Sequence, residues 1–236
     1  MSVLNPQIGI DRETVLTRRR YDRLAAIYDL RTYIAEEYLF KKFRQMLWSR
    51  IKGGRVLELG VGTGANIPYY PKECLVTAVD LSEQMLERAK RRAAKLGVSV
   101  ELRLMDAQNL IFRDHSFDAA ITTCVFCSVP NPVQGMRELG RVVKPGGNIW
   151  LMEHMRVDKP VIGPMMDFVN PFPLRMMGAN INRRTVENVK LAGLKIETIE
   201  DLAGTVFRLI HAHPGYFTHD QNSAIPVIQV VAASQG

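Results

Sequence analysis

The chain has 236 residues, of which 47% are apolar and 23% charged, so it can bury the core of one large domain and is not a disordered chain. Its net charge of +7 favours anionic partners, such as an acidic lipid surface, without requiring one. Three cysteines, an odd and sparse set, exclude a disulfide framework, and no apolar run reaches the roughly 18 residues of a membrane span.

The first fifth of the chain is expected to be mainly helical. Residues 1–16 have no clear periodicity and predict a loose arm. From residue 18 to residue 51 the apolar side chains recur at helical spacing, until Gly53 and Gly54 end the segment. We therefore treat residues 1–52 as an N-terminal arm followed by helices that could lid the domain.

Strands and helices alternate from residue 53 onward. Apolar runs predict strands at 55–59, 75–80, 99–105, 117–123, 148–152, 195–199 and 206–211. Amphipathic segments predict helices at 83–96, 132–143 and 183–191. This order predicts an α/β, Rossmann-like domain over residues 53–213, with a seven-stranded, mostly parallel sheet and helices on both faces.

Two segments interrupt or follow this pattern. Residues 160–179 combine methionine, phenylalanine and four prolines, and predict an apolar insertion without a regular element. In such a sheet we expect the insertion to lie beside the substrate pocket, where flexible methionines suit an apolar substrate. Residues 214–236 form a C-terminal tail, in which residues 225–231 could add a strand or mediate association.

The strongest motif lies where the first strand meets a helix, at Glu58-Leu59-Gly60-Val61-Gly62-Thr63-Gly64-Ala65. Glycines there allow positive φ and a close approach of the backbone to a ligand. Asp80, at the end of the second strand, is placed to bind ribose hydroxyls. The glycine pattern alone fits a nicotinamide dinucleotide as well as S-adenosylmethionine.

Three features favour S-adenosylmethionine as the ligand. Glu58 lies two residues before the first glycine, where a carboxylate can meet an ammonium group. Thr63 and Gly64 complete a G-x-G-x-G loop. Asp106 follows the third strand, where it can accept a hydrogen bond from the adenine amino group. A methionyl group has no pyrophosphate, so its site needs an acid and close backbone more than an anion hole.

Together these motifs resemble class I S-adenosylmethionine-dependent methyltransferases over roughly residues 18–213, including the turn at residues 141–147 before the fifth strand. The resemblance implies an enzyme that binds S-adenosyl-L-methionine and releases S-adenosyl-L-homocysteine. It implies that Glu58 and Gly60 hold the methionyl end, that Asp80 holds the ribose, and that Met85 packs on adenine. The full set of cofactor contacts it implies is Tyr21, Glu58, Gly60, Gly62, Thr63, Gly64, Asp80, Leu81, Met85, Asp106, Ala107 and Cys124.

Residues 21–29, with the pattern Y-D-x-x-A-x-x-Y-D, are similar to the opening of two narrower groups: ubiquinone/menaquinone methyltransferases and bacterial phospholipid N-methyltransferases. Tyr21 and Tyr28 would share one helix face, because they lie seven residues apart. That face either covers the cofactor, with the tyrosine hydroxyls directed toward the acceptor, or only packs against the domain. Residues 123–129 and 152–154 resemble the membrane-associated thiol methyltransferases, so the acceptor atom stays open.

The expected chemistry is an in-line displacement at a sulfonium methyl group, driven mainly by alignment of the nucleophile. Tyr21, Tyr28, Glu153 and His154 are the catalytic candidates, the last two because a base at the strand end could take a proton from an amine. His211 and His213 are weaker candidates. Cys124 and Cys127 form a C-x-x-C without a second pair, so we expect no metal.

The favoured hypothesis is N-methylation of a phospholipid headgroup of the phosphatidylethanolamine type, or of another amphipathic acceptor. Quinone C-methylation and methylation of a small molecule or thiol are the alternatives, and a non-catalytic cofactor-binding module or a nicotinamide dehydrogenase would be a different class. Basic residues at 18–20 and 88–95 are either solvated helix faces or contacts to anionic headgroups. We expect a cytoplasmic protein able to touch a membrane, and no nucleic-acid partner; the oligomeric state stays open.

Overall fold

The computed structural model describes residues 11–35, 38 and 40–215. The calls on residues 1–10 and on residues 216–236, including the strand suggested at 225–231, lie outside the described residues. The helices are α1 (Arg12–Ala35), α2 (Lys41–Ser49), the 3-10 turn η2 (Ile67–Tyr69), α3 (Glu83–Leu96), α4 (Pro132–Val142), α5 (Ile162–Val169), α6 (Pro171–Met177) and α7 (Thr185–Leu191). The strands are β1 (Gly54–Leu59), β2 (Cys74–Asp80), β3 (Glu101–Leu104), β4 (Phe117–Thr123), β5 (Val143–His154), β6 (Lys195–Ala203) and β7 (Phe207–His213).

The sheet has seven strands in the order β3-β2-β1-β4-β5-β7-β6. The first five are parallel, and β7 runs antiparallel to both β5 and β6. The carboxyl ends of β1, β2 and β4 therefore meet at one edge, where Leu59 pairs with Val79 and Thr122. The expected Rossmann-like, mostly parallel seven-stranded fold is confirmed.

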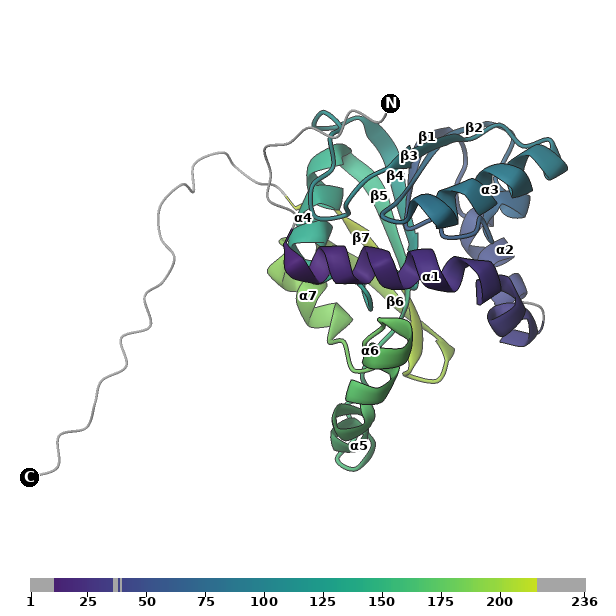
Figure 1. The fold of residues 1–236 in the computed structure, drawn as a ribbon. Helices are drawn as coiled ribbons and strands as arrows, with labels where there is room; N and C mark the ends of the chain where they lie inside the picture. The colour runs from purple at the N-terminus through teal and green to yellow at the C-terminus, as the bar shows by residue number, and fades with distance from the viewer. Residues whose placement is uncertain (1–10, 36–37, 39, 216–236) are drawn as a thin grey trace, which may run out of the picture.

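Two apolar cores lie on opposite faces of this sheet. Alternation along β1 sends Leu57 and Leu59 to one face, with Met136 of α4, and Val56 to the other, with Trp48 of α2 and Ala89 of α3. Helices therefore cover both faces, while α1 crosses the carboxyl edge (Figure 1). This arrangement leaves the strand ends under α1 as the natural place for a ligand.

The prediction of a loose arm is wrong for residues 12–16, which form the first turns of α1. The signal was Asp11: its Oδ1 accepts from the backbone nitrogens of Glu13 and Thr14 at 2.7 and 2.9 Å, as an N-cap does. These bonds also hold the pKa of Asp11 below its usual value. The helical pattern expected from residue 18 to residue 51 corresponds to two helices, α1 and α2.

The prediction that residues 160–179 lack a regular element is also wrong, since α5 and α6 occupy most of them. The prolines that suggested irregular backbone stand in first turns: Pro164 is the third residue of α5, and Pro171 opens α6. Proline is tolerated there because those amides have no partner within the helix. Gly178, with φ of 74°, ends α6. The pair projects away from the body of the domain below α1 (Figure 1).

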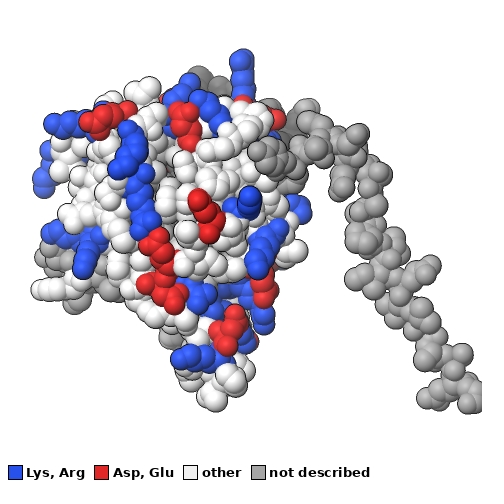
Figure 2. Space-filling view, turned by 180° about the vertical axis from the view of Figure 1, so that it is seen from behind, with Lys and Arg blue, Asp and Glu red and all other residues white. Residues whose placement is uncertain are grey.

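The surface carries its charges in mixed pairs. On the face opposite to that of Figure 1, basic and acidic side chains alternate without a single basic field (Figure 2). Some basic residues of α1 and α3 are paired as well: Arg92 pairs with Asp29 at 3.1 Å, Arg91 with Glu87 at 3.2 Å, and Arg18 with Asp22 at 3.9 Å. Among the described residues, no helix combines the length and apolarity that crossing a bilayer requires.

Candidate active site

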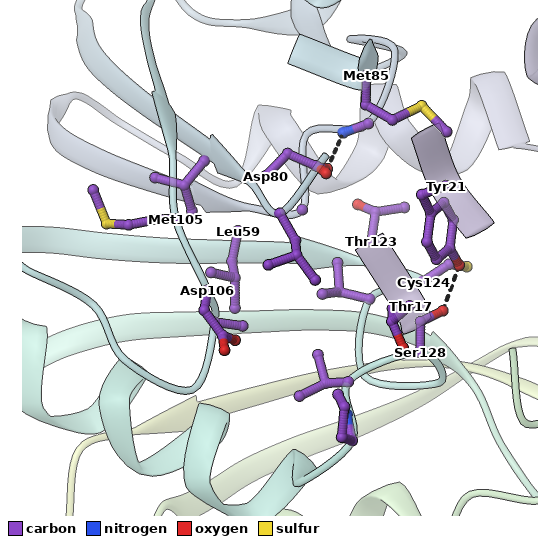
Figure 3. Close-up of a pocket in the computed structure, with 18 of the residues that line it drawn as sticks. Thr17, Tyr21, Leu59, Asp80, Met85, Met105, Asp106, Thr123, Cys124 and Ser128 are labelled. Carbon is purple, nitrogen blue, oxygen red and sulfur yellow. Dashed lines mark hydrogen bonds between the residues drawn. The ribbon is translucent and has the colours of Figure 1, made fainter. Parts of the chain in front are cut away.

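A cleft of about 740 Å³, partly open to solvent, lies at the carboxyl edge of β1, β2 and β4 under α1. Figure 3 shows Thr17 and Tyr21 of α1 on one side and Met105 and Asp106 on the other. The cleft is lined by Thr17, Tyr21, Tyr28, Leu59, Gly60, Gly62, Val79, Asp80, Leu81, Met85, Met105, Asp106, Ala107, Thr123, Cys124, Val125, Ser128, Val129 and Pro130. Nine of the twelve cofactor residues expected from the sequence are in this wall: Tyr21, Gly60, Gly62, Asp80, Leu81, Met85, Asp106, Ala107 and Cys124.

The glycine turn after β1 brings bare backbone to the cleft. Gly60 has φ of 72°, and its nitrogen donates to the carbonyl of Val79 over 2.8 Å. A Cβ atom on Gly60 would lie 2.4 Å from Cγ2 of Val125, so a side chain would displace the opposite wall. The turn therefore needs glycine for both its conformation and its space.

Asp80 presents a carboxylate that the backbone holds in place at the end of β2. Its Oδ2 accepts from the nitrogen of Gly62 at 2.8 Å (Figure 3), and its Oδ1 accepts from the nitrogen of Ser82 at 2.9 Å. Burial raises the pKa of Asp80, which these two hydrogen bonds lower in part. Each oxygen keeps a lone pair for a ligand hydroxyl, which fits the ribose role expected for this residue.

Glu58 lies in a smaller hollow of about 400 Å³, next to the main cleft, together with Thr63. Its carboxylate is 1% exposed and accepts from the Asn66 side chain at 2.7 Å and from the hydroxyl of Tyr70. Burial raises the pKa of Glu58, and these bonds with the nearby Arg44 oppose that rise. Arg44 itself donates to Asn66 over 2.8 Å. Arg44, Asn66 and Tyr70 were not anticipated, because no motif marks a partner of a buried acid.

Gly64 is the one expected cofactor residue that lines neither hollow. Its φ is 84°, and a Cβ there would stand 2.5 Å from Cδ1 of Ile67 and 3.1 Å from Cα of Ala89. The third glycine of the loop thus permits close packing of α3 against the loop. Its place in the motif is explained by packing.

Helix α1 is fastened over the cleft by side-chain hydrogen bonds along its length. The hydroxyl of Tyr21 lies 2.5 Å from that of Ser128, and Thr63 donates to Asp29 over 2.5 Å. Gln108 donates to Thr14 over 2.9 Å. Both tyrosines expected on one helix face, Tyr21 and Tyr28, line the cleft. Thr17 and Ser128 join them, although the sequence analysis did not single them out.

Glu153 and His154 are absent from the described cleft wall. The carboxylate of Glu153 is fully buried at the end of β5, where Oε1 accepts from the nitrogens of Val125 and Phe126 at 2.9 and 3.3 Å and from the Thr122 hydroxyl at 3.1 Å. Burial raises its pKa to about 7. Glu153 thus supports the turn that forms one wall. Burial lowers the pKa of His154.

The two cysteines of the C-x-x-C pattern face different surroundings. Cys124 lines the cleft with φ of 54°, a conformation unusual for a residue with a side chain. Cys127 is buried, and its thiol donates to the carbonyl of Cys124 over 3.3 Å. Burial raises the pKa of Cys127 to about 12, so its thiolate, the nucleophilic form, is scarce at neutral pH.

The comparisons with known proteins agree with this geometry. Residues 57–151 match the family described as a methyltransferase domain. A phosphatidylethanolamine N-methyltransferase of Cereibacter sphaeroides is 40% identical over 48% of the chain and 56% of that relative, so the chain spans little more than half of its length. The human thiol S-methyltransferase TMT1A is 30% identical over 67% of each chain, and relatives named for quinone C-methylation match as well.

Among solved structures, a geranyl diphosphate C-methyltransferase from Streptomyces coelicolor, in complex with S-adenosyl-L-homocysteine, superposes with a TM-score of 0.67 at 15% identity. It covers 87% of this chain and 98% of its own. The chain belongs to the class I S-adenosylmethionine-dependent methyltransferases, whose methyl donor is S-adenosyl-L-methionine.

The residues present suit that donor. The positive-φ glycine turn offers backbone without side chains, and Asp80, whose two oxygens are each held by one backbone nitrogen, lines the same cleft. Met85, from the first turn of α3, and Met105 add apolar surface on which a flat ring such as adenine can pack. Asp106 lies on the same side of the cleft as Met105. We propose that Asp80 holds the ribose, and that Asp106 with Ala107 borders the adenine.

Proposed function

We propose that this methyltransferase N-methylates the headgroup amine of a phospholipid at a membrane surface. The observation that carries the proposal is an exposed apolar surface beside the acceptor side of the cleft, the ridge of α5 and α6. We define the ridge as Val161, Ile162, Met165, Phe168, Val169 and Phe172. Phe168 is 87% exposed and Phe172 is 68% exposed, which is unusual for phenylalanine on a surface that meets only water.

The ridge is connected to the cleft wall by the segment that follows α6. The nitrogen of Asn180 donates to the carbonyl of Cys127 over 2.9 Å, and Arg183 donates to the carbonyl of Val129 over 2.8 Å. Cys127 and Val129 flank Ser128, whose hydroxyl meets Tyr21 inside the cleft. A lipid whose chains rest against the ridge would therefore have its headgroup near the cleft mouth.

The chemistry asks little of the protein beyond alignment. The donor supplies a methyl group on a sulfonium, and an amine displaces it in line, losing a proton to water before or after the transfer. We assign to Tyr21, Tyr28 and Ser128 the task of orienting the amine with hydroxyl groups. Burial keeps Tyr21 protonated, because its pKa is raised well above the usual value. Apolar walls at Val125 and Val129 help to exclude water.

The test is transfer of labelled methyl from S-adenosylmethionine into three separate pools: anionic vesicles that contain phosphatidylethanolamine, a demethylated quinone, and a small alkyl thiol. Label in the phospholipid supports the proposal. Label only in the quinone or the thiol overturns it and leaves the methyltransferase in place. The relatives named for phospholipid, quinone and thiol acceptors make these three pools the discriminating set.

A matched pair of variants separates vesicle docking from chemistry. Phe168→Asp alters the ridge, whereas Ile111→Asp alters another exposed apolar residue, 74% exposed in the loop between β3 and β4. We expect Phe168→Asp to lower co-sedimentation with anionic vesicles and methyl transfer to phospholipid at least tenfold. Ile111→Asp should leave both unchanged, and equal behaviour of the two variants would remove the ridge from the proposal.

A further inference from the structure

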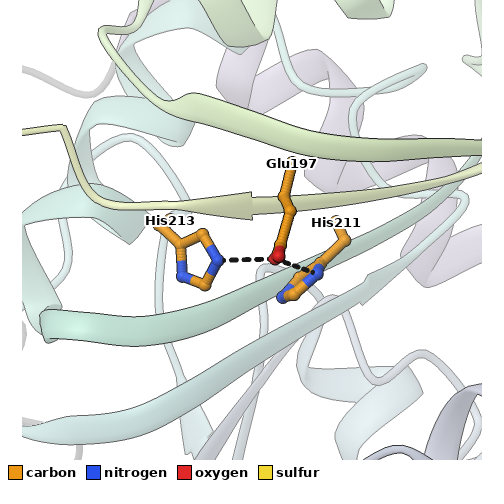
Figure 4. A group of neighbouring side chains, drawn as sticks. All are labelled: Glu197, His211 and His213. Atoms are coloured by element: carbon orange, nitrogen blue, oxygen red, sulfur yellow. Dashed lines mark hydrogen bonds and ion pairs between the residues drawn. The ribbon is translucent and has the colours of Figure 1, made fainter.

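Three potential metal ligands gather outside the cleft wall. Glu197 of β6 and His211 and His213 of β7 offer one ligand atom each, and these atoms lie within 4.8 Å of one another (Figure 4). Among the described residues this is the group of His, Cys, Asp and Glu that is compact enough for an ion. The sequence analysis expected no metal and considered the two histidines only as weak bases.

The strand pairing shows why the group forms. His211 and His213 are two residues apart on β7 and so share one face of the sheet. On β6 the register shifts between Ile196, which pairs with Ala212, and Thr198, which pairs with His211. Glu197 is the extra residue of this β-bulge, and a bulge redirects a side chain that regular pleating would send elsewhere. Its Oε2 lies 2.8 Å from both histidine rings.

The group lies away from the carboxyl edge of the parallel strands. Ala212, between the two histidines, pairs with Ile149 in the middle of β5, while the cleft lies at the carboxyl ends. No group in the cluster belongs to the cleft wall. Any ion here therefore acts apart from methyl transfer.

Hydrogen bonds to each ring leave a lone pair facing Glu197. His213 Nδ1 lies 2.9 Å from the carbonyl oxygen of Gly147, so Nδ1 carries a proton, and in the neutral ring the lone pair is on Nε2. His211 Nε2 lies 2.8 Å from Oδ1 of Asn148, so in the neutral ring that donates to this oxygen the lone pair is on Nδ1. Both free nitrogens point at the same carboxylate oxygen (Figure 4). Lone pairs that face a carboxylate repel it unless a cation lies between them.

Two protons or one metal ion could supply that positive charge. Two imidazolium rings would lie 4.7 Å apart, and His211 also stacks at 3.8 Å on Trp150, over which the Arg50 guanidinium lies at 5.1 Å. A single divalent ion places the charge between all three ligand atoms at once. Carbonyl and amide acceptors behind each ring are the arrangement that orients histidine ligands at metal sites.

We propose that Glu197, His211 and His213 form a zinc-type divalent metal site that ties β6 to β7. Two imidazole nitrogens and one carboxylate suit Zn²⁺, with a fourth position left for water. A small retreat of the Glu197 carboxylate, with rotation of the two imidazole rings toward each other, would place the three ligand atoms around one ion. Magnesium and calcium are disfavoured, because they prefer oxygen ligands.

The experiment is calorimetric titration of Zn²⁺ into the full chain after chelator treatment and dialysis. We expect one ion per chain, with affinity reduced at least tenfold in Glu197→Gln and His213→Gln. His115→Gln, a histidine outside the cluster, should bind as the unaltered chain does. Co²⁺ should give visible absorption of a four- or five-coordinate ion, and Zn²⁺ should change the fluorescence of Trp150, because His211 stacks on it.

Absence of Zn²⁺ binding, or binding unaffected by both Glu197→Gln and His213→Gln, would overturn the site. Glu197 is exposed, so its variant should fold even where a histidine variant does not. Melting temperatures with and without Zn²⁺ give a second measurement. The metal should raise the melting temperature of the unaltered chain but not that of Glu197→Gln. The methyl-transfer activity enters neither measurement.

Discussion

The hydroxyl of Ser82 donates to Oδ1 of Asp22 over 2.6 Å, so the residue that caps α3 also fastens α1 across the cleft. The same Ser82 oxygen accepts from the backbone nitrogen of Met85 at 3.2 Å. Lid and cofactor wall are thus joined at one side chain. Because α1 lies over the cleft, we expect release of such ties to speed entry and exit of the donor.

We expect Asp22→Ala to speed dissociation of S-adenosylmethionine about tenfold, since one hydrogen bond to a charged group contributes about 1.5 kcal/mol or more. Stopped-flow displacement measures this rate. Ser82→Ala removes the same tie and also the α3 N-cap, so it should lower the free energy of unfolding by about 1 kcal/mol more. Equal dissociation rates in Asp22→Ala and the unaltered chain would contradict a lid held by this bond.

Tyr21→Phe should lower kcat about tenfold. This factor should stay the same between pH 7 and pH 10. Burial raises the pKa of Tyr21 well above its usual value, so its hydroxyl remains protonated over that range and orients the acceptor without accepting its proton. A pH series of kcat for both proteins gives the ratio. Ser128→Ala removes the partner at 2.5 Å, and because Ser128 is also assigned to orienting the amine, its deficit in kcat should be equally independent of pH. A deficit that vanishes at high pH would instead identify a base.

Much of the fold was readable from the sequence because local signals and tertiary structure agree. The helix predicted at 83–96 has the bounds of α3, and Ser82 and Gly97, which flank it, have the backbone conformations that an N-cap and a terminating glycine require. The prediction of irregular backbone at residues 160–179 was wrong because proline breaks a helix only outside its first turn. Asp11 was overlooked because the apolar periodicity that marks a helix begins later than its cap.

The residues of the site also differ in whether a local sequence signal marks them. Residues whose backbone position defines their role, such as Gly60 and Asp80, were found from motifs. Glu153 was misjudged as a cleft residue because its place after β5 fixes the edge it occupies but not the direction of its side chain. The cluster at Glu197 depends on a bulge, which shifts a residue between faces and leaves no pattern in the sequence.

Gly60→Ala should impair both stability and donor binding, and Val125→Ala should restore part of each. The added Cβ would lie 2.4 Å from Cγ2 of Val125, while Cβ of Val125 stands at 3.3 Å, a distance that small shifts can accommodate. Gly62→Ala is the control, because it has similar φ of 56° but nothing within 4 Å of the new atom. It should cost only about 1 kcal/mol of backbone strain.

Urea denaturation and calorimetric binding of S-adenosylmethionine to Gly60→Ala, Val125→Ala and the double variant complete the cycle. We expect Gly60→Ala to lose at least 2 kcal/mol of unfolding free energy. Additive losses in the double variant would show that the damage comes from φ alone.

Glu153→Gln should make the protein more stable than the unaltered chain at pH 8 but not at pH 4.5. Burial raises the pKa of Glu153 from 4.5 to about 7, so between these values the folded state holds a proton that the unfolded state has lost. The favourable contribution of the protonated acid is fully present below pH 4.5 and is lost as the pH rises through 7. The loss is about 3 kcal/mol.

Glutamine keeps an acceptor for the nitrogens of Val125 and Phe126 and cannot ionise, so it removes this slope. Urea denaturation of both proteins at pH 4.5, 6 and 8 gives the difference. Glu58 and Asp80, whose pKa values burial also raises, contribute equally to both proteins and cancel. A constant difference across the three pH values would mean that Glu153 is ionised in the folded state throughout, with its charge held by the turn at 124–126.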